Sequence, residues 1–179
     1  PRQFDFWLGE WDVTSRFWRA GSPEAVVPGG KLHGETVLDG AAVMEHFRGA
    51  NWKGDDVLGF SLRAYDPEKE AWVILLNWPS TNAPFWTMEG NFDFNRGVFH
   101  GTRTTPAGDT LKTRYTFSDL IPGYYRWEIN TSSDDGATWS YPSYLMEGVR
   151  RAPDADPIDE AWLHGEDIEN RCPGDKRKQ

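Results

Sequence analysis

Apolar and polar side chains alternate along most of the chain, and short turn sequences interrupt this alternation at close intervals. Alternation with a period of two is typical of a β-strand that is buried on one face. In residues 124–132, for example, Tyr125, Trp127 and Ile129 share one face, while Arg126 lies on the other. The same pattern predicts ten strands, at residues 10–20, 31–38, 41–49, 57–65, 71–78, 85–94, 98–105, 110–118, 124–132 and 138–149.

The predicted strands are joined by short turns. Asp39-Gly40 is an Asx-Gly pair, which is the strongest short signal for a hairpin. Proline-containing turns follow at residues 66–69, 106–109 and 121–123. Short connections imply that consecutive strands pair in antiparallel fashion, and closure of the sheet removes its exposed edges. We therefore predict an all-β fold, a ten-stranded antiparallel up-and-down barrel.

The pattern changes near the C-terminus. Asp156-Pro157 is a typical helix start, with the aspartate as N-cap and the proline in the first helical position. Ile158 and Trp162 are four residues apart, so both can face the barrel. We accordingly divide the chain into a barrel domain, residues 1–152, and a short helix with a loose polar tail, residues 153–179.

Composition changes this picture in two respects. Ten Trp, ten Phe and six Tyr among 179 residues favour strands around a large apolar interior over a helical bundle. The single cysteine, Cys172, excludes a disulfide framework and a multi-cysteine metal site within one chain. No histidine pair has zinc spacing, so we predict no metal site.

Charge and hydropathy bear on partners and location. The net charge of -9 disfavours nucleic acid and anionic membranes as partners. No apolar run is long enough to span a membrane. The cytoplasm is the favoured compartment because no apolar leader opens the chain. Export stays an alternative, since the first residue is Pro1 rather than Met.

Two local motifs support the strand-and-turn pattern. Residues 132–139 match an Asp-box, S-x-D-x-G-x-T-W, in which the aspartate and glycine make a turn that the hydroxyl groups and the tryptophan hold. A single copy predicts a structural hairpin. Gly9 and Trp11 form the G-x-W arrangement found at the closed end of lipocalin-like barrels, where the indole fills the barrel floor.

Together with three further segments, these motifs resemble the bacterial DUF1579 family in content and order. The matching segments are residues 4–13, 65–72, 86–93, 126–128 and 132–139, followed by Arg150. The resemblance implies a calycin-like, lipocalin-like barrel. It implies no particular activity, because no function is assigned to that family.

Nitrobindins, which are haem proteins with a similar ten-stranded barrel, are a more distant comparison. A haem would need an axial ligand, usually histidine, inside the barrel. The nitrobindin-like pattern has this histidine in the last strand, but residues 138–149 contain none, and His100 is the best substitute. We therefore predict no cofactor.

Glu45 and His46 are the candidate catalytic residues. Side chains alternate along residues 41–49, so only one of the two faces the interior. Glu45 shares its face with Val43 and Phe47, which is the more apolar face, and we predict that Glu45 points inward. A carboxyl in an aromatic cavity is a candidate general acid or base.

A structural role for Glu45 requires an arginine that reaches the interior. Arg103, Arg114 and Arg126 each stand on a predicted strand, and we expect Glu45 to pair with one of them. A paired Glu45 would stabilise the fold or orient a ligand. If Glu45 lies on the outer surface instead, His46 takes the interior role.

Residues 71–78 break the alternation, because Val73, Ile74, Leu75 and Leu76 are all apolar. Such a strand is covered on both faces. The helix, an N-terminal segment or a second subunit could supply the cover, so a homodimer is among the predicted assemblies.

Three function classes follow from this fold. We favour binding of a small hydrophobic or aromatic ligand in the barrel interior. The alternatives are a cofactor-free lyase, isomerase or cyclase that acts on a small aromatic substrate by acid–base chemistry, and a structural protein with a filled barrel. The volume and lining of the interior distinguish the three. The predicted ligand-binding residues are Trp11, Trp78, Trp86, Tyr115, Trp127 and Arg126.

Overall fold

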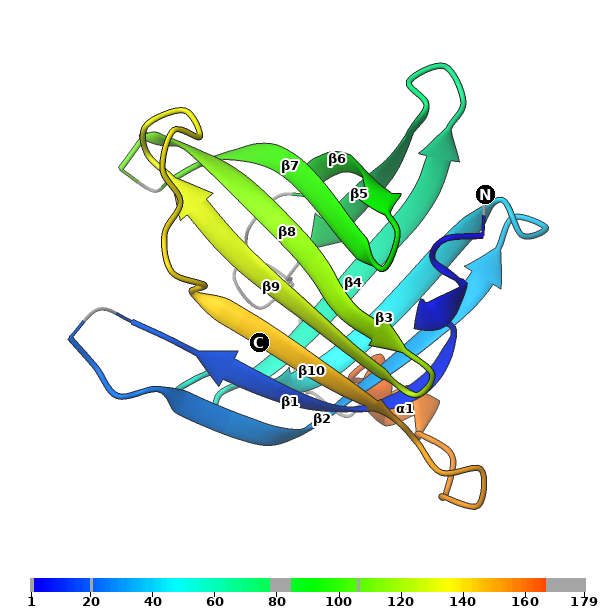
Figure 1. Ribbon diagram of the computed structural model, residues 1–179. Coiled ribbons are helices and arrows are strands. Elements are labelled where there is room, and N and C mark those ends of the chain that lie inside the picture. Colours follow the sequence, from blue (N-terminus) through cyan, green and yellow to red (C-terminus); the bar gives the residue numbers. More distant parts are fainter. Residues whose placement is uncertain (1, 20, 78–84, 106, 167–179) are drawn as a thin grey trace, which may run out of the picture.

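Ten antiparallel strands form a closed barrel in the computed structural model (Figure 1), which describes residues 2–19, 21–77, 85–105 and 107–166. Each strand pairs with its neighbours in sequence, and β1 closes the ring by pairing with β10. The predicted up-and-down barrel is confirmed. The strands are β1 Gly9–Phe17, β2 Ala25–Val37, β3 Ala42–Ala50, β4 Asp56–Asp66, β5 Ala71–Asn77, β6 Trp86–Asp93, β7 Arg96–Thr104, β8 Thr110–Ile121, β9 Tyr124–Ser132 and β10 Tyr144–Arg150.

Two strands begin six residues away from their predicted starts. β2 begins at Ala25, because an irregularity between Val13 and Ser15 lets the β1–β2 ladder continue past Gly30. β10 begins only at Tyr144. The Asp-box turn and the loop after it occupy the residues that precede β10.

One end of the barrel is closed by the start of the chain. Residues 4–7, which we call the plug, include the 3-10 helix η1 Asp5–Trp7, and η1 lies within that end in Figure 1. Phe4 and Trp7 are fully buried, and the ring of Phe4 packs edge-on against Trp72 and Phe92. A Cβ on Gly34 would collide with the carbonyl of Trp7, so glycine permits this close approach.

Trp11 lies next to the plug and completes the closed end. Its ring is 1% exposed, and its indole N–H donates to the carbonyl oxygen of Trp7 over 3.0 Å. The guanidinium of Arg150 lies 3.8 Å from the centre of the ring on the outer side. Trp11 thus fills the barrel floor, as the G-x-W motif indicates.

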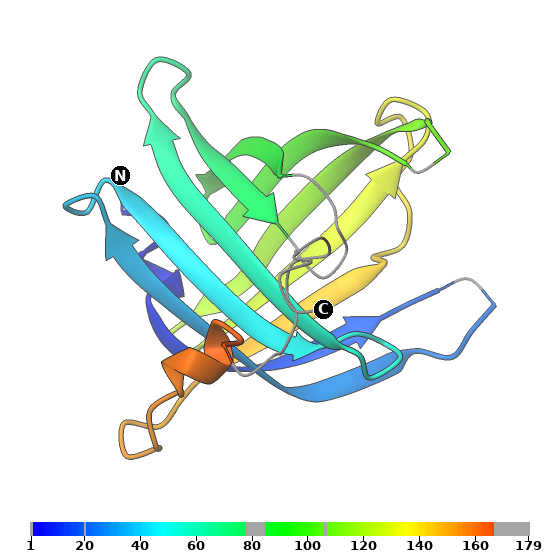
Figure 2. The same ribbon diagram turned by 180° about the vertical axis from the view of Figure 1, so that it is seen from behind.

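A short helix, α1 Glu160–Leu163, lies on the outside of the barrel against β3 (Figure 2). Asp159 is its N-cap and accepts a hydrogen bond from the backbone N–H of Trp162, so the helix starts later than the predicted cap at Asp156. Arg48 of β3 donates to the carbonyl oxygen of Trp162 and lies against its ring. The division of the chain at residue 152 stays a prediction.

The apolar run on β5 is buried on one face and half-buried on the other. Ile74 and Leu76 face the core, while Val73 and Leu75 face outward next to Leu62 of β4. The helix lies chiefly on β3, so it is not the main cover of this face. The homodimer accordingly stays a prediction. None of the helices in the described ranges is long and apolar enough to cross a membrane.

Candidate functional site

A buried polar cluster lies in the middle of the barrel and is centred on Glu45. The side chain of Glu45 points inward from β3, as the alternation of that strand predicts, and is 4% exposed. Its Oε2 accepts hydrogen bonds from the indole of Trp7 over 2.9 Å and from the hydroxyl of Ser61 over 2.8 Å. The same oxygen accepts a third bond from the guanidinium of Arg63.

Arg63 is therefore the partner of Glu45, and the expected pairing with Arg103, Arg114 or Arg126 is wrong. Arg63 extends inward from β4, is 3% exposed, and its guanidinium lies over the ring of Trp7 at 4.5 Å. Arg103 shares the parity of the inward-facing Phe99 on β7 but is exposed, and it forms no ion pair with Glu45. Arg114 and Arg126 lie on the outer side. Arg114, for example, packs over the Asp-box residue Trp139.

The polarity of β4 is the reverse of the usual pattern. Ser61 and Arg63 face the interior, while Phe60 and Leu62 face outward and are half-buried. Ser61 lies directly opposite Glu45 in the β3–β4 ladder. Residues that lie opposite each other in a ladder point to the same face of the sheet. Ser61 therefore points inward with Glu45, and Arg63 points inward with Val43.

A small cavity of about 10 Å³ lies beside this cluster. Such a volume accommodates about one water-sized group. Trp127, Tyr115 and Met146 form part of its wall together with Glu45 and Arg63. Burial raises the pKa of Tyr115 far above its ordinary value. The Tyr115 hydroxyl thus stays protonated at neutral pH.

A larger and mainly apolar pocket of about 210 Å³ lies above the small cavity, at the end opposite the plug. We call it the mouth pocket. Its lining residues come from five strands and the β3–β4 turn: Phe17, Phe47, Ala50, Asn51, Val57, Ile129 and Tyr144. Tyr144 contributes a hydroxyl group, which shares a hydrogen bond of 2.9 Å with Ser15 on the barrel wall.

The mouth pocket and the small cavity are successive layers of one interior. Glu45 in the cavity wall is followed two residues later on β3 by Phe47 in the pocket wall. On β9, Trp127 and Ile129 have the same relation. Since a strand rises about 3.3 Å per residue, the two layers lie about 7 Å apart.

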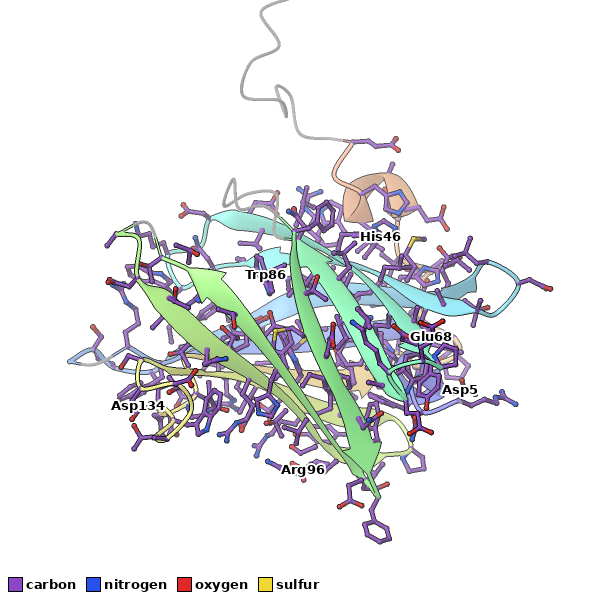
Figure 3. The ribbon with its side chains drawn as sticks, turned by 90° about the horizontal axis from the view of Figure 1, so that it is seen from above. Asp5, His46, Glu68, Trp86, Arg96 and Asp134 are labelled. Atoms are coloured by element: carbon purple, nitrogen blue, oxygen red, sulfur yellow. The ribbon has the colours of Figure 1, made fainter. Side chains whose placement is uncertain are left out.

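His46, the second candidate catalytic residue, is on the outer side of β3. In Figure 3 its side chain lies next to helix α1, and its ring is 4.2 Å from that of His164. Burial lowers the pKa of His46, and the nearby His164 lowers it further, while Glu35 acts in the opposite direction. His46 contributes nothing to the wall of the small cavity or of the mouth pocket.

The six predicted ligand-binding residues lie in different parts of the barrel, and two of them line the cavity. Tyr115 and Trp127 line the small cavity. Trp11 is packed in the closed end, and Arg126 is half-exposed on the outer face of β9 near Glu147.

Trp86 is half-buried on the face of β6 that also carries the buried Met88, and it donates its indole N–H to the hydroxyl of Tyr115 over 2.6 Å. It thus holds the Tyr115 hydroxyl in place from within the barrel. Trp78 lies outside the described residues.

Several site residues were not predicted from the sequence. Phe17, Phe47, Ile129 and Tyr144 each stand two residues beyond an inward-facing position of the same strand, so strand parity was a sufficient signal for them. Arg63 had a weaker signal, which was its place across the β3–β4 turn from Glu45.

Metal and haem ligands are the remaining question. The described ranges contain no group of three His, Cys, Asp or Glu residues arranged to hold a metal ion. The four histidines lie on the outer side: His33, His46 and His100 alternate with inward-facing residues of their strands, and His164 follows helix α1. A haem inside the barrel would therefore lack an axial histidine from this chain.

Comparison with known proteins supports the fold alone. No model of a known protein family matches the chain, and no curated protein matches its sequence. The crystal structure of Rv2717c from M. tuberculosis matches with a TM-score of 0.55 at 9% identity, covering 85% of this chain and 99% of that one. The chain thus forms a ten-stranded barrel that resembles the calycin-like barrel of Rv2717c.

Two further barrels match less well. A redesigned β-barrel, b11L5F_LGL, has a TM-score of 0.46 at 11% identity and covers 84% of this chain and 96% of that one. EF1p2_mFAP2b, whose structure contains bound DFHBI, has a TM-score of 0.45 at 13% identity, with 84% and 98% covered. None of these comparisons confirms the resemblance to the DUF1579 family.

Proposed function

We propose that this protein binds a small apolar or aromatic molecule in the mouth pocket. The observation that supports the proposal is an apolar pocket of about 210 Å³ at one end of a barrel whose other end is filled. A cavity of roughly 150 Å³ lined by apolar side chains is known to bind benzene. The mouth pocket has room for a slightly larger molecule, such as a two-ring aromatic compound.

The filled half of the barrel limits the structural alternative. Phe4, Trp7 and Trp11 occupy the closed end with their own rings, as a purely structural barrel would require. The half of the barrel at the mouth differs, because it contains an apolar space that is lined in part by Ile129 and Tyr144. In the described part of the chain, the mouth is therefore the end at which a ligand would enter.

Acid–base catalysis is less well supported. Three donors engage one oxygen of Glu45, and one of them is the cation of Arg63. A carboxylate held in this way stabilises the fold or orients a ligand more readily than it transfers a proton. Membership of the DUF1579 family also stays a prediction from the motifs.

Titration with 1-aminonaphthalene, a neutral two-ring dye whose emission moves to shorter wavelength in apolar sites, tests the proposal. We expect saturable binding with one site per chain. Ile129→Arg places a long charged side chain in the mouth pocket, and we expect at least a tenfold higher Kd, which is about 1.4 kcal/mol. Ile121→Arg is the control, because Ile121 is 58% exposed at the closed end.

Circular dichroism must show that both variants keep the barrel. Absence of saturable binding to the unaltered protein would overturn the proposal. Equal affinities of the Ile129→Arg variant and the unaltered protein would place the dye elsewhere and would overturn it as well.

A further inference from the structure

The small cavity is walled by hydrogen-bond donors that have no acceptor. The Nε and Nη1 atoms of Arg63 and the indole Nε1 of Trp127 are buried, and nothing in the described part of the chain accepts a hydrogen bond from them. Both side chains line the same cavity, and they are 3% and 5% exposed. Buried donors are rarely left without a partner, so such a set indicates a place for an acceptor atom.

Charge balance limits what that acceptor can be. Arg63 is already paired with Glu45, so the buried cluster is neutral as a whole. A second anion in the cavity would leave a net negative charge in an aromatic interior, which is costly. A neutral acceptor, such as a carbonyl oxygen, uses the free donors of Arg63 and Trp127 without that cost.

The two layers of the interior fit a molecule with two different ends. The small cavity has room for one oxygen atom, while the mouth pocket about 7 Å above it has room for aromatic rings. Tyr144 joins the layers, because its ring lines the mouth pocket and packs against Trp127 with centres 5.5 Å apart. The hydrogen bond to Ser15 holds the Tyr144 hydroxyl at the barrel wall.

We propose that the ligand is an aromatic ketone or aldehyde whose rings occupy the mouth pocket and whose carbonyl oxygen accepts hydrogen bonds from Trp127 and Arg63 in the small cavity. This inference rests on the proposed function and adds the polar group that the ligand carries. The donors give selectivity, because a hydrocarbon of the same shape leaves them without an acceptor.

A matched pair of probes tests the proposal. 2-Acetylnaphthalene and 2-isopropenylnaphthalene have nearly the same shape, but only the first has a carbonyl oxygen. In displacement of 1-aminonaphthalene, we expect the ketone to bind at least ten times more tightly than the hydrocarbon. The carbonyl stretch of the bound ketone should move to lower wavenumber, as it does on hydrogen bonding.

One variant and its control test whether the indole of Trp127 is a donor to the ligand. Trp127→Phe keeps an aromatic ring but removes the indole N–H, and we expect most of the preference for the ketone and part of the infrared shift to disappear. Trp162→Phe is the control, since Trp162 lies on helix α1 outside the barrel and lines neither the small cavity nor the mouth pocket. It should keep the preference and the shift. The infrared measurement on the unaltered protein needs no variant, so the proposal is tested even if Trp127→Phe does not fold.

The outcomes separate this inference from the proposed function. Equal affinities for the two probes with an unshifted carbonyl stretch would overturn the inference and leave the mouth pocket as a purely apolar site. Tighter binding of the anion 2-naphthoate than of the ketone would contradict the inference that the ligand's acceptor atom is uncharged. Failure of the dye and both probes to bind would overturn the proposed function itself.

Discussion

Glu45 and Arg63 carry opposite charges in an aromatic interior, and each depends on the other. Transfer of both charges from water to the interior costs free energy, and this cost offsets most of their mutual attraction. The ion pair therefore stabilises the fold about as much as two apolar side chains of similar size would. Loss of one partner is much more damaging, because the other charge then stays buried without its counter-ion. Arg63 is the more informative partner to replace, since Glu45 also accepts bonds from Trp7 and Ser61.

We predict that Arg63→Met lowers the free energy of unfolding by about 3–5 kcal/mol. Urea unfolding followed by tryptophan fluorescence measures this change. The double variant Glu45→Gln with Arg63→Met removes both charges and should be more stable than Arg63→Met alone. A double variant that loses the sum of the two single losses would show that the charges are not coupled.

At this scale the sequence predicted one half of the pair. Strand parity placed Glu45 inside, because Val43 and Phe47 mark the apolar face of its strand. The same reasoning gives the wrong face for Arg63, whose neighbour Leu62 is apolar and lies outside. A hydrophobic pattern identifies the buried face of a strand only where that face is apolar. On β4 the buried face carries Ser61 and Arg63, so the pattern indicates the opposite face.

Among the elements, the Asp-box turn between β9 and β10 is held by a single carboxylate. Asp134, at the mouth end of the barrel (Figure 3), accepts hydrogen bonds from the hydroxyl of Ser132 and from the hydroxyl and backbone N–H of Thr138. These bonds lower the pKa of Asp134 from 3.8 to about 2. The stabilising effect of ionised Asp134 is therefore fully present above pH 3.8 and is lost as the pH falls towards 2.

We predict that Thr138→Val raises the pKa of Asp134, because the variant lacks the hydroxyl donor but keeps the backbone one. A carbon-detected NMR titration of the aspartate carboxyl groups measures the change. Ser133→Ala is the control, since Ser133 is exposed in the same turn. An Asp134 pKa that is the same in the Thr138→Val variant as in the unaltered protein would contradict the assigned role of the hydroxyl.

Element positions were predicted well wherever a tight turn separates two strands. The turn at Asp39-Gly40 connects β2 and β3 as expected, with Asp39 and Gly40 both at positive φ. Two of the errors arose from side chains that bond to the backbone. The bonds around Asp134 keep the chain in a turn, and Asp159 caps the helix later than Asp156 would.

On the scale of the whole barrel, the strands form a closed ring in which each one is hydrogen-bonded to a neighbour on both sides. We expect one cooperative transition, in which far-UV circular dichroism and tryptophan fluorescence have the same midpoint. Trp11 is packed in the closed end, and Trp11→Ala should move that single transition by about 3–5 kcal/mol.

Trp52→Ala is the matched control, because Trp52 is 44% exposed and its ring lies against the side chains of Arg19 and Lys53. We expect Trp52→Ala to lower the free energy of unfolding by less than about 1 kcal/mol. A Trp11→Ala variant that unfolds in two separate steps would show that the closed end is an independent unit.

Closure of the ring has a consequence for the order of events during synthesis. β1 is made first, but its partner β10 is made last, and the ladder between them pairs Trp11 with Arg150. At 5–20 residues per second, β1 waits roughly 10 s on the ribosome before that partner emerges. Tyr144, which belongs to the wall of the mouth pocket, is on the same final strand. A nascent chain therefore lacks a complete mouth pocket until β10 has emerged from the ribosome.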